Sequence, residues 1–133
     1  MRTFVTVDIV IETPEGIPLI RRGSSPYRGF WAIPGGIVED DETVESAAVR
    51  EAEEETGLST KDLSILGVYS DPQRDPRGRS ISIAFVARGA GQPESGSDAA
   101  AIEVFKPPEF PAKMAFDHSK ILRDYLSSKA GDS

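Results

Sequence analysis

The chain has 133 residues, 38% of them hydrophobic and 28% charged, and a net charge of -7. These values are typical of one folded domain, expected here over residues 1–133, and leave no room for a second. The absence of cysteine excludes disulfides, thiolate metal sites and a cysteine nucleophile. A single histidine, His118, excludes a metal site built on several imidazoles.

Alternation of apolar and polar residues predicts a first strand over residues 4–11. A turn at Pro14, Glu15 and Gly16 then predicts the returning strand of a hairpin over 17–22. A short apolar segment at 30–33 then runs into a sharp bend at Pro34, Gly35 and Gly36. The remaining strands are expected at residues 64–69, 80–87 and 102–105.

Two helices complete the prediction. Thr43 is a favourable cap for a helix over residues 44–55, which contain no Gly or Pro, and Gly57 suits a left-handed end. A second helix is expected after Asp117 because an apolar stripe follows it. Strands mixed with two helices predict an α/β (α+β) fold.

The negative charge is concentrated in one segment, since residues 39–55 contain nine acids against one base and carry a local net charge of -8. On a helical wheel the apolar stripe consists of Val44, Ala47 and Ala48. The same stripe continues in Glu51 and Glu55, with Glu54 at its margin. Packing on a sheet would direct these carboxylates to the sheet edge, where a cation would relieve their repulsion. Oxygen ligands suit Mg²⁺ or Mn²⁺. A metal-dependent phosphoryl site and a purely structural acidic helix both remain open on this evidence.

Residues 36–58, GIVEDDETVESAAVREAEEETGL, resemble the Nudix box, Gx5Ex7REUxEExGU with U aliphatic. The identities fall on Gly36, Glu42, Arg50, Glu51, Glu54, Glu55 and Gly57, with Leu58 at the last aliphatic position. Ala52 is smaller than the usual aliphatic residue, a departure that concerns packing. Seven identities at fixed spacing over 23 residues make a specific signal.

The resemblance implies a Nudix-type α/β/α sandwich, with a mixed β-sheet between helices, and Mg²⁺- or Mn²⁺-dependent hydrolysis of a nucleoside diphosphate derivative. It implies Glu51, Glu54 and Glu55 as metal ligands, with a carbonyl from Gly35. Either Glu54 or Glu55 would also hold the attacking water. Arg50 would act at the catalytic centre by orienting the carboxylates, supported by Glu42 and Gly36.

Residues 69–85 and 115–126 resemble a subgroup of small ADP-ribose pyrophosphatases, and Pro72 fits the pattern of that subgroup. Arg79 and Phe30 depart from it. The resemblance implies hydrolysis of ADP-ribose to AMP and ribose 5-phosphate. Two alternatives are hydrolysis of an oxidised or non-standard nucleoside triphosphate, and a nucleotide-sensing module without catalysis. Homodimers are common among the proteins that it resembles.

For several single residues the sequence allows two interpretations of their role. Glu39 either contacts substrate or holds the loop. Arg74 and Arg77 either clamp phosphate or brace the turn through neighbouring aspartates. Trp31 either stacks on a base or packs in the pocket wall, and His118 is expected to be structural rather than a base.

A fourth acid outside the box often supports catalysis in the family, and the candidates are Glu94, Asp98 and Glu103. The basic residues form no stripe interleaved with aromatics, so nucleic acid is not an expected partner. No signal-like N-terminus or long apolar run is visible, and we expect a cytoplasmic protein without a membrane partner.

Overall fold

The computed structural model describes residues 2–131. Its elements, in chain order, are β1 (Thr3–Glu12), β2 (Ile17–Arg22), β3 (Trp31–Ala32), β4 (Gly35–Ile37), α1 (Val44–Thr56), β5 (Ser59–Tyr69), β6 (Arg79–Ala90), β7 (Ala99–Phe105) and α2 (His118–Gly131). Within these described residues, neither helix has the length and apolar character that crossing a membrane requires.

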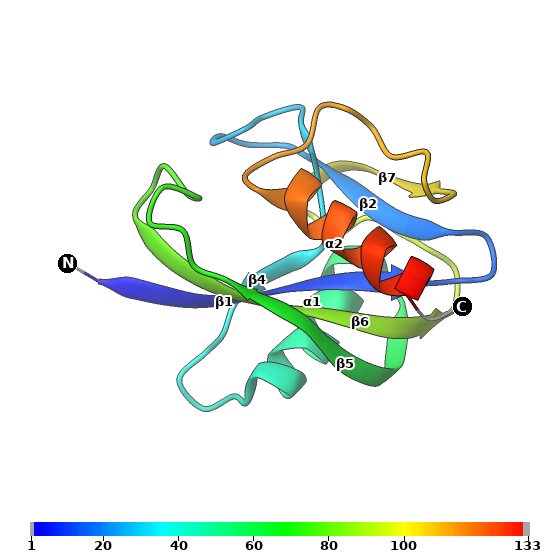
Figure 1. Ribbon diagram of the computed structural model, residues 1–133, viewed down its shortest axis with the longest axis horizontal. Helices are drawn as coiled ribbons and strands as arrows, with labels where there is room; N and C mark the ends of the chain where they lie inside the picture. Colours follow the sequence, from blue (N-terminus) through cyan, green and yellow to red (C-terminus); the bar gives the residue numbers. More distant parts are fainter. Residues whose placement is uncertain (1, 132–133) are drawn as a thin grey trace.

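The strands form two sheets. The larger has the order β4-β1-β6-β5, with β1 and β6 parallel and the other pairs antiparallel, and the smaller has the order β3-β2-β7. Figure 1 shows α1 below the larger sheet and α2 above it, beside the smaller sheet. The prediction of an α+β fold with a mixed sheet between helices is confirmed, with the strands divided between two sheets.

Alternation along β1 explains the two cores. Val7, Ile9 and Ile11 are completely buried in a cluster with the alanines of α1, whereas Val10 points the other way into a cluster with Ile121 of α2. One strand with a period of two can therefore supply both faces of the sandwich. The predicted strand over residues 4–11 lies within β1.

The helix α1 begins and ends where the sequence predicts. The Thr43 hydroxyl accepts a hydrogen bond from the Ser46 N–H at 3.1 Å, and Gly57 closes the helix in the left-handed conformation with φ of 73°. Ala47 and Ala48 are fully buried, so α1 packs closely on the sheet. This close packing fixes the rotation of α1 and thereby the direction of its acidic residues.

The predicted bend lies at Pro34, but the two glycines after it differ from the prediction because they continue as a strand. Gly35 and Gly36 belong to β4, which pairs antiparallel with β1 through Asp8 and Val7. A Cβ on Gly35 would lie 2.1 Å from the Val7 carbonyl oxygen, so only glycine allows this approach. Two successive glycines disfavour a strand in isolation, and the pairing with β1 overrides that preference.

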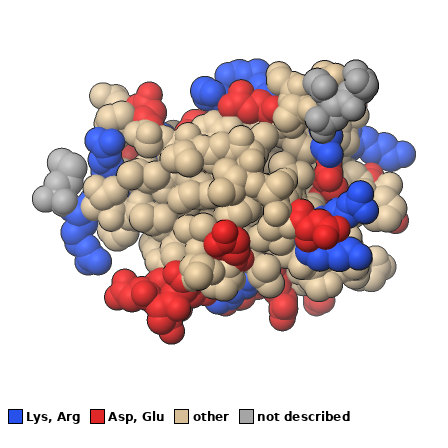
Figure 2. Space-filling model, turned by 60° about the horizontal axis from the view of Figure 1, so that its bottom comes forward, with Lys and Arg blue, Asp and Glu red and all other residues tan. Residues whose placement is uncertain are grey.

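The strand β5 begins at Ser59, earlier than predicted. Its register with β6 shifts between Lys61 and Ser64 and again between Ile65 and Gly67, which breaks the regular alternation of the strand. Figure 2 turns the lower side of the molecule forward and shows a broad area with few charged side chains. On β5, Ile65 is 58% and Val68 61% exposed.

Candidate active site

The acidic half of α1 faces β4. The Glu51 side chain is almost buried, and a Cβ on Gly36 would lie 2.4 Å from its Oε1. A carboxylate of α1 can therefore reach the edge of the larger sheet because residue 36 is a glycine. This position agrees with the helical-wheel prediction for Glu51.

Arg50 joins the carboxylates of the box. Its Nε and Nη2 donate to the two oxygens of Glu42 at 2.6 and 2.8 Å, and its Nη1 donates to Glu51 at 2.8 Å and to Glu54 at 3.2 Å. The hydrogen bonds from Arg50 and from the backbone N–H of Glu39 lower the pKa of Glu42 to about 2. Arg50 and Glu42 thus form a bidentate ion pair that orients the neighbouring acids. Glu39 contributes its backbone to this pair, and its side chain is exposed.

Glu55 lies in a different environment from Glu42. Burial raises its pKa to about 7, the negative charges of Glu51 and Asp98 add to the rise, and the positive charge of Arg22 opposes it. The carboxylates around Glu55 therefore repel one another in the folded chain. This repulsion is what a bound cation would relieve.

Among the candidate fourth acids, Asp98 lies nearest to this group. It lines a hollow of about 190 Å³ together with Glu55 and Arg22. Glu94 packs on the end of α1, where its backbone N–H donates to the Thr56 carbonyl at 2.7 Å. Glu103 is exposed on β7.

A cleft of about 220 Å³ adjoins this hollow and shares Ile20, Arg22 and Glu55 with it. Other residues that line the cleft include Asp8, Gly35, Gly36, Arg77, Phe116 and His118. The cleft therefore brings residues of the box together with three arginines from outside it, Arg22, Arg74 and Arg77. Arg22 was not singled out from the sequence, although strand alternation places it on the same face of β2 as the buried Ile20.

Arg74 does not offer a free guanidinium to the cleft. Its Nε and Nη2 donate to Asp117 at 2.9 and 2.8 Å, and its Nη1 donates to the Ser80 hydroxyl at 2.7 Å. The side chain is also buried. These contacts support the bracing interpretation rather than the phosphate clamp, with Asp117 as the partner in place of the neighbouring Asp71 and Asp75.

His118 and Asp8 belong to the same buried network. The Nδ1 of His118 accepts a hydrogen bond from the Ile33 N–H at 3.0 Å, and its Nε2 lies 3.4 Å from Asp8. Burial acts to raise the pKa of Asp8, but His118, Ser82 and Arg74 outweigh it and hold that pKa below its ordinary value. These contacts support a structural role for His118.

Arg77 and Trp31, the two other residues predicted to contact substrate, lie in different parts of the structure. Arg77 lines the cleft and forms an ion pair with Asp75 at 2.9 Å. Trp31 contacts Phe105 edge to face, with ring centroids 5.1 Å apart, and packs against the core beside α2. The contacts of Trp31 support the packing interpretation.

The donor set at the edge of β4 fits a hard divalent cation. Three carboxylates of α1 and the backbone of Gly35 are oxygen donors, and the glycine at 36 keeps a side chain out of the space that Glu51 enters. Within residues 2–131, no three acidic or histidine side chains are already arranged around one point. Arg50 instead bridges Glu51 and Glu54.

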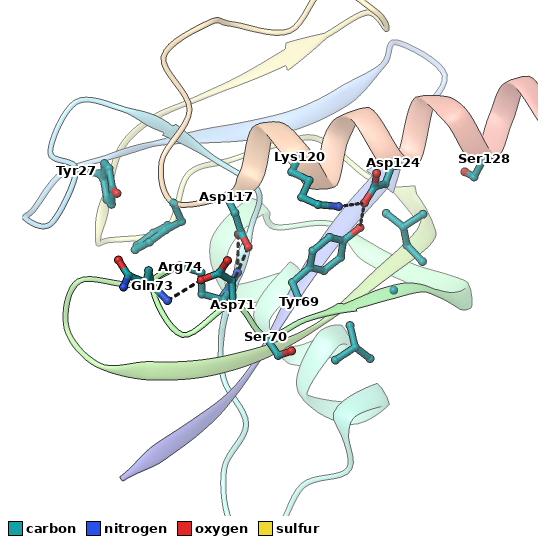
Figure 3. A pocket seen from close by; sticks show the side chains of 14 residues that line it. Tyr27, Tyr69, Ser70, Asp71, Gln73, Arg74, Asp117, Lys120, Asp124 and Ser128 are labelled. Atoms are coloured by element: carbon teal, nitrogen blue, oxygen red, sulfur yellow. Dashed lines mark hydrogen bonds and ion pairs between the residues drawn. The ribbon is translucent and has the colours of Figure 1, made fainter. Parts of the chain in front are cut away.

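A larger hollow of about 660 Å³ lies between β5 and α2, on the far side of Arg74 (Figure 3). Its polar side chains largely satisfy one another: the Tyr69 hydroxyl donates to Asp124 at 2.7 Å, and Lys120 donates to the same carboxylate at 3.0 Å. No residue of the 36–58 segment lines it. Residues of the 36–58 segment thus line the smaller cleft and not this larger hollow.

Comparison with known proteins agrees with this geometry. Residues 2–125 match the family model described as NUDIX domain, and the chain belongs to that family. It is 51% identical over 128 residues to an ADP-ribose pyrophosphatase of Methanocaldococcus jannaschii, which covers 96% of this chain and 75% of that protein.

Two solved structures share the fold. One is a MutT/nudix family protein from Enterococcus faecalis, with a TM-score of 0.89 and 26% identity, covering 98% of this chain. The other is a bifunctional NMN adenylyltransferase/ADP ribose pyrophosphatase from Francisella tularensis complexed with AMP and a manganese ion, with a TM-score of 0.82, 27% identity and 96% coverage. This chain spans 63% and 42% of the lengths of those two chains.

Proposed function

We propose that this chain is a divalent-metal-dependent hydrolase that converts ADP-ribose and one water into AMP and ribose 5-phosphate. One observation carries the reaction class: the carboxylates of α1 meet β4 at a glycine pair, beside a cleft that also holds arginines. Support for the substrate comes from the 51% identity to the archaeal ADP-ribose pyrophosphatase over almost the whole chain.

In this proposal Glu51, Glu54 and Glu55 hold the metal together with the carbonyl of Gly35. A bound Mg²⁺ or Mn²⁺ would neutralise the diphosphate and lower the pKa of a bound water. Arg50 keeps the carboxylates oriented through its contacts with Glu51 and Glu54.

The reaction breaks one phosphoric anhydride bond. The oxygen of water bonds to one phosphorus of the diphosphate, and the bridging oxygen leaves with the other phosphate. Glu54 or Glu55 holds the attacking water and accepts its proton. We favour Glu55, because its carboxylate lines the cleft.

In this proposal either Mg²⁺ or Mn²⁺ occupies the metal site. A cytoplasmic location and a homodimer are also part of the proposal. The manganese and AMP in the Francisella tularensis structure support a nucleotide site that accepts Mn²⁺. The remaining predicted contacts to substrate are those of Arg77 and Glu39. A single domain over residues 1–133 also stays a prediction.

The test is product release from a panel of ADP-ribose, NADH, diadenosine polyphosphates, 8-oxo-dGTP and ordinary nucleoside triphosphates, with Mg²⁺, Mn²⁺ or chelator. We expect metal-dependent AMP formation that is fastest on ADP-ribose. Activity confined to triphosphates, with release of pyrophosphate, would refute the substrate. Binding of ADP-ribose without turnover would favour the sensing module.

Matched variants of α1 test the site itself. Glu55→Gln keeps the side-chain volume but removes the charge, and we expect kcat to fall by orders of magnitude. Glu53→Gln, on the exposed side of the same helix, should leave kcat unchanged. Equal rates for the two variants would show that Glu55 is not part of the catalytic site.

A further inference from the structure

Arg22 is a cation of the cleft, and its acidic neighbours Asp75 and Glu55 act on it through their charge rather than through an ion pair. Its Nε donates to the Pro26 carbonyl at 2.7 Å, and among the described residues no carboxylate oxygen lies within ion-pair distance of its guanidinium. Burial lowers the pKa of Arg22 and the positive charge of Arg77 lowers it further, whereas the negative charges of Asp75 and Glu55 oppose the shift. Two guanidiniums of the same sign are therefore held near each other beside the cleft.

The ring of Phe116 contacts both guanidinium groups. The Cζ of Arg22 lies 5.1 Å and the Cζ of Arg77 lies 5.5 Å from the centroid of the Phe116 ring. Cation–π contact attracts each guanidinium to the ring and offsets part of their mutual repulsion. Asp75 restrains Arg77 further, through bonds at 3.1 and 2.9 Å to its Nε and Nη2.

The backbone at this ring is strained. Phe116 has φ of 53° and Tyr27 has φ of 62°, a left-handed conformation that bulky side chains rarely adopt. The two rings contact each other edge to face at 4.9 Å. Strain of this kind persists where surrounding structure imposes it, and it is concentrated at sites with a function.

We infer that Phe116 positions Arg22 and Arg77 as a two-guanidinium seat for the diphosphate of the substrate, in the cleft that Glu55 also lines. This inference rests on the proposed function and extends it. Guanidinium groups match the geometry of phosphate oxygens, so the seat binds the anion while the acidic residues of α1 act from the other side. Arg22 thereby takes the phosphate-binding role that was one of the two interpretations of Arg74.

The first experiment measures steady-state kinetics of Arg22→Gln and Arg77→Gln on ADP-ribose. We expect KM to rise by about 10- to 100-fold for Arg22→Gln and less for Arg77→Gln, whose charge is shared with Asp75. Arg21→Gln is the matched control, because Arg21 is exposed on the other face of β2. A KM for Arg22→Gln equal to that of the control would overturn the inference.

The second experiment measures binding of inorganic pyrophosphate and AMP by calorimetry in the presence of chelator, so that the readout does not depend on turnover. Affinity should fall in Arg22→Gln and persist in Arg21→Gln. If the wild type fails to hydrolyse ADP-ribose, the proposed function is wrong, and this binding comparison still tests the seat. Equal affinities for all three proteins would refute it.

Variants of Phe116 test the positioning role. Phe116→Asn removes the ring but tolerates a left-handed backbone, whereas Phe116→Tyr keeps an aromatic face. We expect KM to rise for the Asn variant and to return toward the wild-type value for the Tyr variant, with kcat little changed in both. A normal KM in Phe116→Asn, or a loss confined to kcat, would show that the ring does not position the arginines.

Discussion

Replacing Glu55 by Gln should make the metal-free protein more stable while it abolishes activity. The pKa of Glu55 is raised from 4.5 to about 7 in the folded chain. At pH 8 this shift corresponds to roughly 3 kcal/mol of lost unfolding free energy. Because the side chain is partly exposed and shares its repulsion with Glu51, we expect about 1–2 kcal/mol.

The raised pKa of Glu55 determines how the free energy of unfolding changes with pH. Below pH 4.5 the carboxyl is protonated in both states and costs nothing. Between about pH 4.5 and 7 the folded chain retains a proton that the unfolded chain has lost, so stability falls as pH rises. Above pH 7 the cost is constant. Gln carries no charge, so Glu55→Gln avoids the cost.

The assay is thermal unfolding in chelator at pH 8 and at pH 4.5. We expect Glu55→Gln to raise Tm by about 4 °C per kcal/mol at pH 8 and to match the wild type at pH 4.5. Glu53→Gln serves as the control for loss of an exposed charge. If Glu55→Gln brings no increase at pH 8, or the same increase at both pH values, the electrostatic reasoning is wrong.

Three further predictions concern the metal site and two residues near it, Gly36 and Arg74. Mg²⁺ should raise the Tm of the wild type more at pH 8 than at pH 5.5, because the metal binds ionised carboxylates. Differential scanning fluorimetry measures the two Tm increases, and equal increases at the two pH values would contradict the prediction. Gly36→Ala should lower kcat, because its Cβ would lie 2.4 Å from the Glu51 carboxylate and displace it. The loss of unfolding free energy in urea titrations should be small, about 1 kcal/mol, because only the end of a side chain has to move; an unchanged kcat would contradict the role of Gly36. Arg74→Gln should cost about 3 kcal/mol, as Asp117 and Asp8 lose a buried partner, but leave KM for ADP-ribose near the wild-type value; a KM change without a loss of stability would restore the clamp interpretation.

Local signals predicted the acidic helix and the orientation of its side chains. The cap at Thr43, the glycine at 57 and the wheel positions of α1 all lie within one helix, so their geometry follows from a fixed rise and rotation. The position of Glu51 at the sheet edge follows from the buried alanines of the same helix.

The cationic half could not be predicted in the same way, because it depends on contacts between distant segments. Arg22 and Arg74 look equivalent in the sequence. Only the fold shows that Arg74 meets Asp117, 43 residues away, whereas Arg22 meets a carbonyl of its own loop. The glycines of β4 were misread for a similar reason, since their strand conformation depends on pairing with β1.

The strand β5 has a consequence for self-association. It is an edge strand of 11 residues with exposed Ile65 and Val68, which is the kind of element that templates fibril growth when its backbone is regular. The register shifts near Lys61 and Gly67, and the left-handed Asp62, interrupt the row of free amide and carbonyl groups. These irregularities leave the apolar side chains of β5 accessible but deprive an incoming strand of a continuous hydrogen-bonding edge, so we expect them to slow aggregation through β5.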